Sequence, residues 1–113
     1  MTSGDWIIFE FADKEMRCNP KWLKINQFVL NGLTLFLNGL KSIRLFFQYS
    51  GSNGWANEQK IQNIHNKNAN DQWFKLDEIE QEDRLELIKL VIDNNHGDGE
   101  CSSFYSFVLT EKN

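Results

Sequence analysis

The clearest hydrophobic pattern in the chain lies in residues 42–50, SIRLFFQYS. Successive side chains of a strand point to opposite faces, so an extended segment here has one fully apolar face and one mixed face. This arrangement predicts a strand with one face on a core. The apolar face consists of Ile43, Leu45, Phe47 and Tyr49.

Two glycines after this strand predict a reversal of the chain. Gly51 and Gly54 tolerate positive φ, so we expect a β-hairpin over Ser42–Ile64. In the return segment, Ile61 and Ile64 are three residues apart and would point to opposite faces of a regular strand. A bulge would bring both side chains to the core, and a short helical turn is the alternative.

Alternation also predicts a strand near each end of the chain, in Asp5–Ala12 and in Cys101–Thr110. The expected apolar faces are Ile7, Phe9 and Phe11 in the first segment, and Tyr105, Phe107 and Leu109 in the second. The shorter segment Gln72–Leu76 predicts an edge strand or an extended link. We expect Trp73 and Phe74 to pack against the sheet.

A helix is predicted over Asp77–Asn94. Asp77 and Glu80 match a capping-box pattern, and the acids around them would interact favourably with the positive end of the helix dipole. The positions expected to face the core are Ile79, Leu85, Ile88, Val91 and Ile92. The polar run Asn94–Gly97 would end the helix.

The segment Pro20–Asn38 supports two interpretations. Asn19 and Pro20 resemble the start of a helix, and apolar residues recur at helical spacing after them. In favour of strands, Asn31-Gly32 and Asn38-Gly39 are dipeptides typical of hairpin turns. The helix is preferred because the apolar stripe continues through Gly32, and a β-meander is the alternative.

These elements predict one α+β domain over residues 1–113, with a mostly antiparallel sheet of four to five strands and two helices on one face. The sequence has no apolar run of about 18 residues that would span a membrane. Its N-terminus has no basic segment typical of a secretory signal. We therefore expect a cytoplasmic protein in which Cys18 and Cys101 are reduced thiols.

Charge is distributed unevenly along the chain. Residues 1–76 hold nine Lys and Arg against six Asp and Glu, whereas residues 77–113 hold three against ten. An acidic half disfavours direct nucleic-acid binding, because counterion release rewards Lys and Arg, and it suits a basic protein partner. The alternative is a solvated acidic face. The candidate partner-binding residues are Asp77, Glu78, Glu80, Glu82, Asp83 and Glu86.

A second candidate site lies in the motif HGDGE. His96, Asp98 and Glu100 alternate with glycines, and an imidazole with two carboxylates suits a divalent metal. The spacing does not fit a calcium-binding loop, and a Gly-rich polar turn is the alternative. The sequence contains no CxxC pair and no phosphate-binding loop, so we expect no cofactor.

Several short motifs resemble a small bacterial and phage domain family of unknown function. They are Gly39-Leu40, the turn Tyr49–Gly54, the pair Ile61 and Ile64, and the turn Asn95–Glu100. The resemblance covers roughly residues 30–110 and implies an α+β order of elements, with no activity attached. Asn53 and Trp55 depart from the family pattern, which has Gly and Asp-like residues there.

Small size, an acidic half and the phage-like resemblance favour a non-enzymatic binding protein. We expect an inhibitor or antidote acting on a basic protein partner, such as a nucleic-acid-binding enzyme. Phage antidefence (anti-CRISPR or anti-restriction) and toxin immunity are the classes that fit. Two alternatives stay open. One is a metal-dependent hydrolase that uses His96, Asp98 and Glu100; the other is a homo-oligomer, such as a homodimer, whose interface includes Trp55 and Trp73.

Overall fold

The computed structural model describes residues 4, 6–10, 19–26, 40–65, 71–80, 83–95 and 106–110. Within these ranges the chain forms strands and contains no helix. The strands are β1 (Trp6–Glu10), β2 (Trp22–Asn26), β3 (Leu40–Tyr49), β4 (Ala56–Ile61), β5 (Gln72–Lys75), β6 (Leu85–Asn95) and β7 (Ser106–Thr110).

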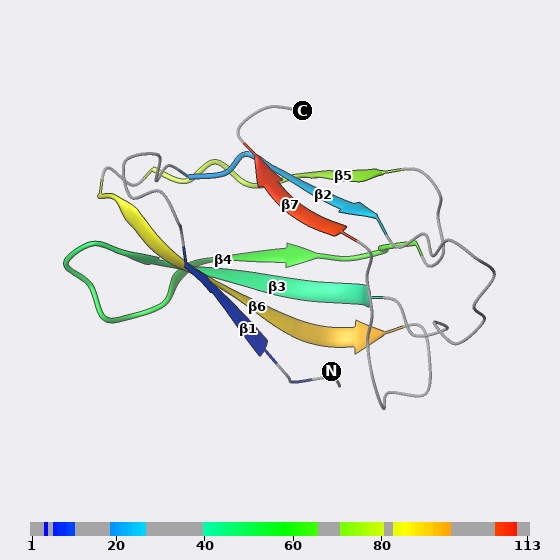
Figure 1. Cartoon of the computed structure of the whole chain (residues 1–113), viewed down its shortest axis with the longest axis horizontal. Coiled ribbons are helices and arrows are strands. Elements are labelled where there is room, and N and C mark those ends of the chain that lie inside the picture. Colours follow the sequence, from blue (N-terminus) through cyan, green and yellow to red (C-terminus); the bar gives the residue numbers. More distant parts are fainter. Residues whose placement is uncertain are drawn as a thin grey trace.

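The strands form two antiparallel sheets (Figure 1). The larger sheet has the order β1-β6-β3-β4 and the smaller sheet has the order β5-β2-β7. Leu23 and Ile25 of β2 join the inward residues of β3 and β6 in one buried cluster. The two sheets therefore pack as layers around a shared core.

The predicted α+β class is wrong, and the main reason is the segment expected to be a helix over Asp77–Asn94. Residues 85–95 form β6, which lies between β1 and β3 in the larger sheet, and residues 77–80 have no regular structure. The run LELIKLVI contains both periods: Leu85, Ile88 and Ile92 fit a helix, whereas Ile88, Leu90 and Ile92 fit a strand. This segment is a strand because it pairs with β1 and β3, and the local sequence alone does not reveal such long-range pairing.

The preferred helix over Pro20–Asn38 is also wrong where the structure describes it. Trp22–Asn26 forms β2, in which Leu23 and Ile25 are fully buried and the residues between them are half-buried. Trp22 and Ile25, three apart in the expected helical stripe, lie on opposite faces of this strand. The first two strands of the alternative meander and both Asn-Gly turns fall in residues 27–39, outside the described residues, and its last strand lies in β3.

The hairpin prediction is confirmed. β3 and β4 pair antiparallel, and the four apolar residues predicted to face the core are buried. The pairing shifts between Leu45–Gln59 and Phe47–Ala56, so a bulge containing Asn57 (φ 55°) lies in the return strand, earlier than expected. Ile61 and Ile64 are both buried because Asn63, at φ 60°, turns the chain between them.

The terminal and edge strands follow the predictions in part. Within Asp5–Ala12, β1 has Ile7 and Phe9 half-buried and its other residues exposed, as expected. β5 is an edge strand, but Trp73 is 37% exposed and does not pack inward, whereas Phe74 contacts the core. Of the predicted C-terminal strand, only β7 lies within the described residues. Those residues also include no helix long and apolar enough to cross a membrane.

Candidate partner-binding site

The segment 76–80 leads from β5 toward β6 and is held against both sheets. The Leu76 N–H donates to the Lys21 carbonyl at 2.9 Å, which fixes the segment beside the chain entering β2 (Figure 1). Leu76 is buried, and Ile79 packs against the core cluster. Two apolar anchors three residues apart therefore fix the backbone between them.

A buried glutamine binds the backbone of this segment from β4. Gln59 is only 5% exposed. Its Oε1 accepts the Asp77 N–H at 2.9 Å, and its Nε2 donates to the Asp77 carbonyl at 3.4 Å. The side-chain amide thus satisfies both the N–H and the carbonyl of Asp77. A partly buried loop has no strand partner for these groups, so a side chain must supply the hydrogen bonds.

The predicted partner-binding carboxylates fall into two groups. Asp77, Glu78 and Glu80 are exposed on the anchored segment. In residues 71–80 and their described neighbours, these three carboxylates take part in no ion pair or side-chain hydrogen bond. Asp83 and Glu86 lie at the start of β6 and have interactions of their own. Glu82 lies outside the described residues.

A groove of about 670 Å³ lies between this segment and the residues that lead into β2. One wall consists of residues 19–22 and the other of residues 75–79. Its size is in the range of pockets that hold small ligands or a few side chains. Lys21 on one wall lies opposite Asp77 and Glu78 on the other, which also carries Lys75, and Trp22 and Ile79 supply apolar lining. The groove therefore suits a side chain with an apolar stem and a charged end.

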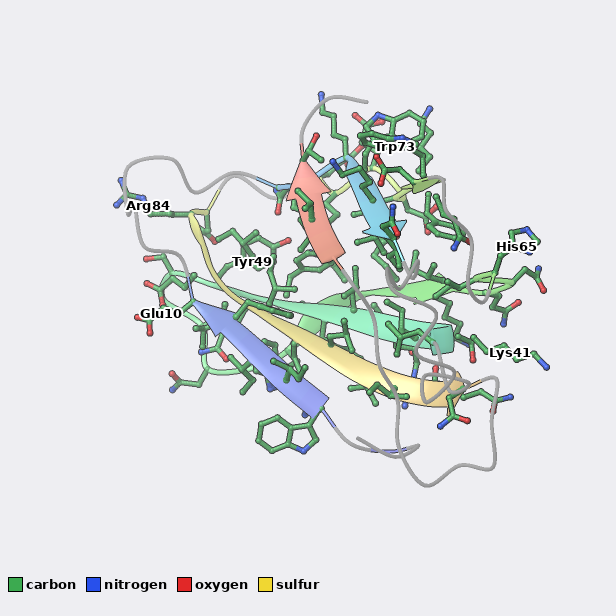
Figure 2. All side chains as sticks on the ribbon, turned by 45° about the vertical axis from the view of Figure 1, so that its right-hand side comes forward. Glu10, Lys41, Tyr49, His65, Trp73 and Arg84 are labelled. Carbon is green, nitrogen blue, oxygen red and sulfur yellow. The ribbon has the colours of Figure 1, made fainter. Side chains whose placement is uncertain are left out.

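Tyr49 fixes the wall at Asn19. The Tyr49 hydroxyl donates to Asn19 Oδ1 at 2.8 Å and accepts a hydrogen bond from Asn57 Nδ2 at 3.0 Å. Figure 2 shows Tyr49 in the space between the sheets, where it is 3% exposed. Burial raises the pKa of Tyr49, because it disfavours the phenolate, while the bond from Asn57 opposes the shift. Tyr49 is therefore neutral at physiological pH and remains a donor to Asn19.

The larger sheet carries a second polar hollow of about 340 Å³ around Arg44. Arg44 Nε lies 2.8 and 3.0 Å from the two Asp93 oxygens, and Nη1 lies 3.6 Å from Glu58 Oε1. The hydrogen bond to Asp93 is the first cause of the raised pKa of Arg44. This cation is therefore already paired with two carboxylates.

The alternative sites gain no geometry from the structure. His96, Asp98 and Glu100 lie outside the described residues, as do Cys18 and Cys101. Among the residues that the structure places, no group of three His, Cys, Asp or Glu side chains could hold a metal ion. His65 is exposed, and its backbone exchanges two hydrogen bonds with the Gln72 side chain.

The two tryptophans expected to share an oligomer interface do not lie on one surface. Trp55 contacts Lys89 on the outer face of the larger sheet, with the Lys89 Nζ 5.7 Å from the ring centroid. Trp73 lies on the outer face of the smaller sheet, beside Trp22. In the sequence, Trp and Lys stand two residues apart in both WLK (22–24) and WFK (73–75). This repeat indicates a shared outer face on two strands, but the helix predicted over Pro20–Asn38 concealed it.

No family model, curated protein or solved structure matches this chain. The resemblance to a phage domain family stays a prediction. The feature of the described surface that bears on function is the acidic segment 77–80, held in place beside the groove.

Proposed function

We propose that this protein is a non-enzymatic binding protein that recognises a basic surface of another protein. The acidic segment 77–80 and the groove beside it form the docking surface. One observation carries the proposal: three exposed carboxylates lie on a backbone held by Gln59, Leu76 and Ile79. Holding charges in place before binding lowers the ordering cost of association.

Electrostatics would contribute mainly to the rate and selectivity of binding. Carboxylates at the rim of an interface attract a basic partner and repel acidic competitors. A Lys or Arg of the partner would place its aliphatic stem against Trp22 and Ile79 in the groove, and its charged end beside Asp77 and Glu78. Asp83, Glu86 and the neighbouring Glu82 extend the acidic sequence on the β6 side.

The class of function that we propose is an inhibitor or antidote acting in the cytoplasm. A nucleic-acid-binding enzyme is a suitable target, because its phosphate-binding surface is basic and an acidic protein can occupy it. Phage antidefence and toxin immunity are the two settings that use such proteins. The charge and geometry of segment 77–80 support a basic protein target, and the inhibitor class rests on analogy with other small acidic binding proteins.

Partner capture from host lysate, with identification by mass spectrometry, tests the proposal. The variant carries Glu78→Lys and Glu80→Lys; the control carries Glu10→Lys and Asp71→Lys, two exposed acids elsewhere with the same change in net charge. We expect wild type and control to capture the same protein and the variant to lose it. If a folded variant captures that protein as well as wild type does, the acidic segment is not the docking surface.

A further inference from the structure

The outer face of the smaller sheet gathers aromatic and basic side chains. Residues paired across antiparallel strands share a face. Lys24 of β2 pairs with Trp73 and Val108, and Trp22 pairs with Lys75 and Thr110. The alternate residue of β2, Leu23, faces the core. We call this outer surface the tryptophan face; it consists of Trp22, Lys24, Trp73, Lys75 and Val108.

The aromatic part of this face is held in place yet accessible. Trp22 and Trp73 pack edge to face, with ring centroids 6.4 Å apart and an interplanar angle of 83°. Lys24 Nζ lies 5.5 Å from the Trp73 ring centroid. Trp73 still exposes 37% of its surface and Val108 exposes 40%. Figure 2 shows Trp73 on the side of the smaller sheet away from the larger sheet.

The charge of this face is opposite to that of the segment 77–80. Strands β2, β5 and β7 read WLKIN, QWFK and SFVLT, with two lysines and no Asp or Glu. Lys21 directly precedes β2. Asp71 lies at the rim, before β5, where it accepts a hydrogen bond from Asn26 at 3.1 Å. The charge complement of such a face is an anion.

We propose that the tryptophan face binds single-stranded nucleic acid. An unpaired base would replace the Lys24 ammonium over the Trp73 ring, and Lys24, Lys75 and Lys21 would then contact the phosphates beside it. Single strands are bound in this way because every base has a π-face and every nucleotide a phosphate. A duplex keeps its bases stacked internally and would engage only the lysines. An acidic protein segment would likewise leave the exposed ring without a stacking partner.

This site is compatible with the acidic composition of the whole chain. The expectation of no direct nucleic-acid binding came from charge counted along the sequence, whereas binding responds to local charge. The site overlaps the groove proposed for the protein partner in part, because Lys21, Trp22 and Lys75 also line that groove. Trp73 and Lys24 do not line the groove beside segment 77–80, so substitutions at these two positions test the tryptophan face alone.

Fluorescence anisotropy with a labelled oligothymidylate of about 15 nucleotides tests the site at low ionic strength. We expect Trp73→Ala to weaken binding by roughly 5- to 150-fold, the range for loss of one stacking ring, and Trp73→Phe to restore most of the affinity. Lys24→Glu leaves both rings in place; it should weaken binding and flatten the salt dependence. The matched control is Trp6→Ala, which removes a tryptophan that is 55% exposed on the other sheet and should leave affinity unchanged.

Three results would overturn the inference. The first is no binding of the oligothymidylate by wild type. The second is equal weakening by Trp6→Ala and Trp73→Ala. The third is binding of a duplex of the same length, or of a polyglutamate peptide, as tight as binding of the single strand. The last result would identify the face as a general anion or acidic-protein surface.

Discussion

Two buried polar side chains, Tyr49 and Gln59, connect segments that no strand pairing joins. Tyr49 links the larger sheet to Asn19, at the entrance to β2, and Gln59 links β4 to Asp77. A sequence cannot reveal either role, because each depends on residues 18 to 30 positions away. The sequence shows only that Tyr49 brings a hydroxyl group to a strand face whose other side chains have no polar atom.

Tyr49→Phe should lower the free energy of unfolding by about 1 kcal/mol, since it removes the hydroxyl and its two hydrogen bonds but keeps the ring. Urea denaturation near neutral pH would measure this. The matched control is Gln48→Ala on the other face of β3, where we expect a smaller loss. An unchanged unfolding midpoint for Tyr49→Phe would show that the link to Asn19 does not hold the wall.

The raised pKa of Tyr49 also predicts a pH dependence. Its contribution to stability is fully present below the ordinary tyrosine pKa of about 10 and is lost as pH rises through the higher folded-state pKa. Wild type should therefore lose stability above about pH 10 more steeply than Tyr49→Phe does. Thermal unfolding across this range would test it, and parallel curves for the two proteins would contradict it.

Gln59→Leu should lower the free energy of unfolding by about 1–3 kcal/mol, because it leaves the Asp77 N–H and carbonyl without their partner. Hydrogen exchange at the Asp77 amide should become faster in this variant. Gln62→Leu, an exposed position beyond the end of β4, is the control and should change neither quantity much. Unchanged exchange at Asp77 would mean that Gln59 does not fix the acidic segment.

At the scale of elements, segments whose apolar residues alternate with a period of two were predicted correctly as strands. Segments whose apolar residues fit both a helix and a strand were predicted wrongly. The strands in 5–12 and 42–50 were predicted correctly because their apolar faces fit one period alone. Residues 85–92 fit two periods, and the capping pattern of Asp77 and Glu80 lies in a loop instead. Asn19-Pro20 likewise precedes a strand. Pairing between distant strands decided these segments, and the fold class with them.

The position of β6 gives a test that separates strand from helix. Ile88 and Leu90 are both buried on one face of β6, whereas residues two apart on a helix lie on nearly opposite sides. We expect Ile88→Ala and Leu90→Ala each to lower the free energy of unfolding by about 2–5 kcal/mol. Leu87→Ala, at a half-buried position, should have a smaller effect. A smaller loss for Leu90→Ala than for Leu87→Ala would contradict this strand.

At the scale of the whole molecule, two surfaces of opposite charge adjoin each other at Trp22 and Lys75. The acidic segment 77–80 borders the groove, and the tryptophan face carries only lysines among the charged residues of its strands. The charge imbalance along the sequence predicted an acidic surface and gave no indication of the basic face. Their locations could not be predicted, because the fold places β2, β5 and β7 side by side from three distant parts of the chain.

The most direct measurement is the affinity of the captured protein partner for Glu78→Gln with Glu80→Gln, measured by calorimetry at several salt concentrations. Neutralising the charges while keeping side-chain size isolates electrostatics from shape. We expect weaker binding and a smaller salt dependence than wild type shows. Affinity and salt dependence equal to those of wild type would contradict this prediction.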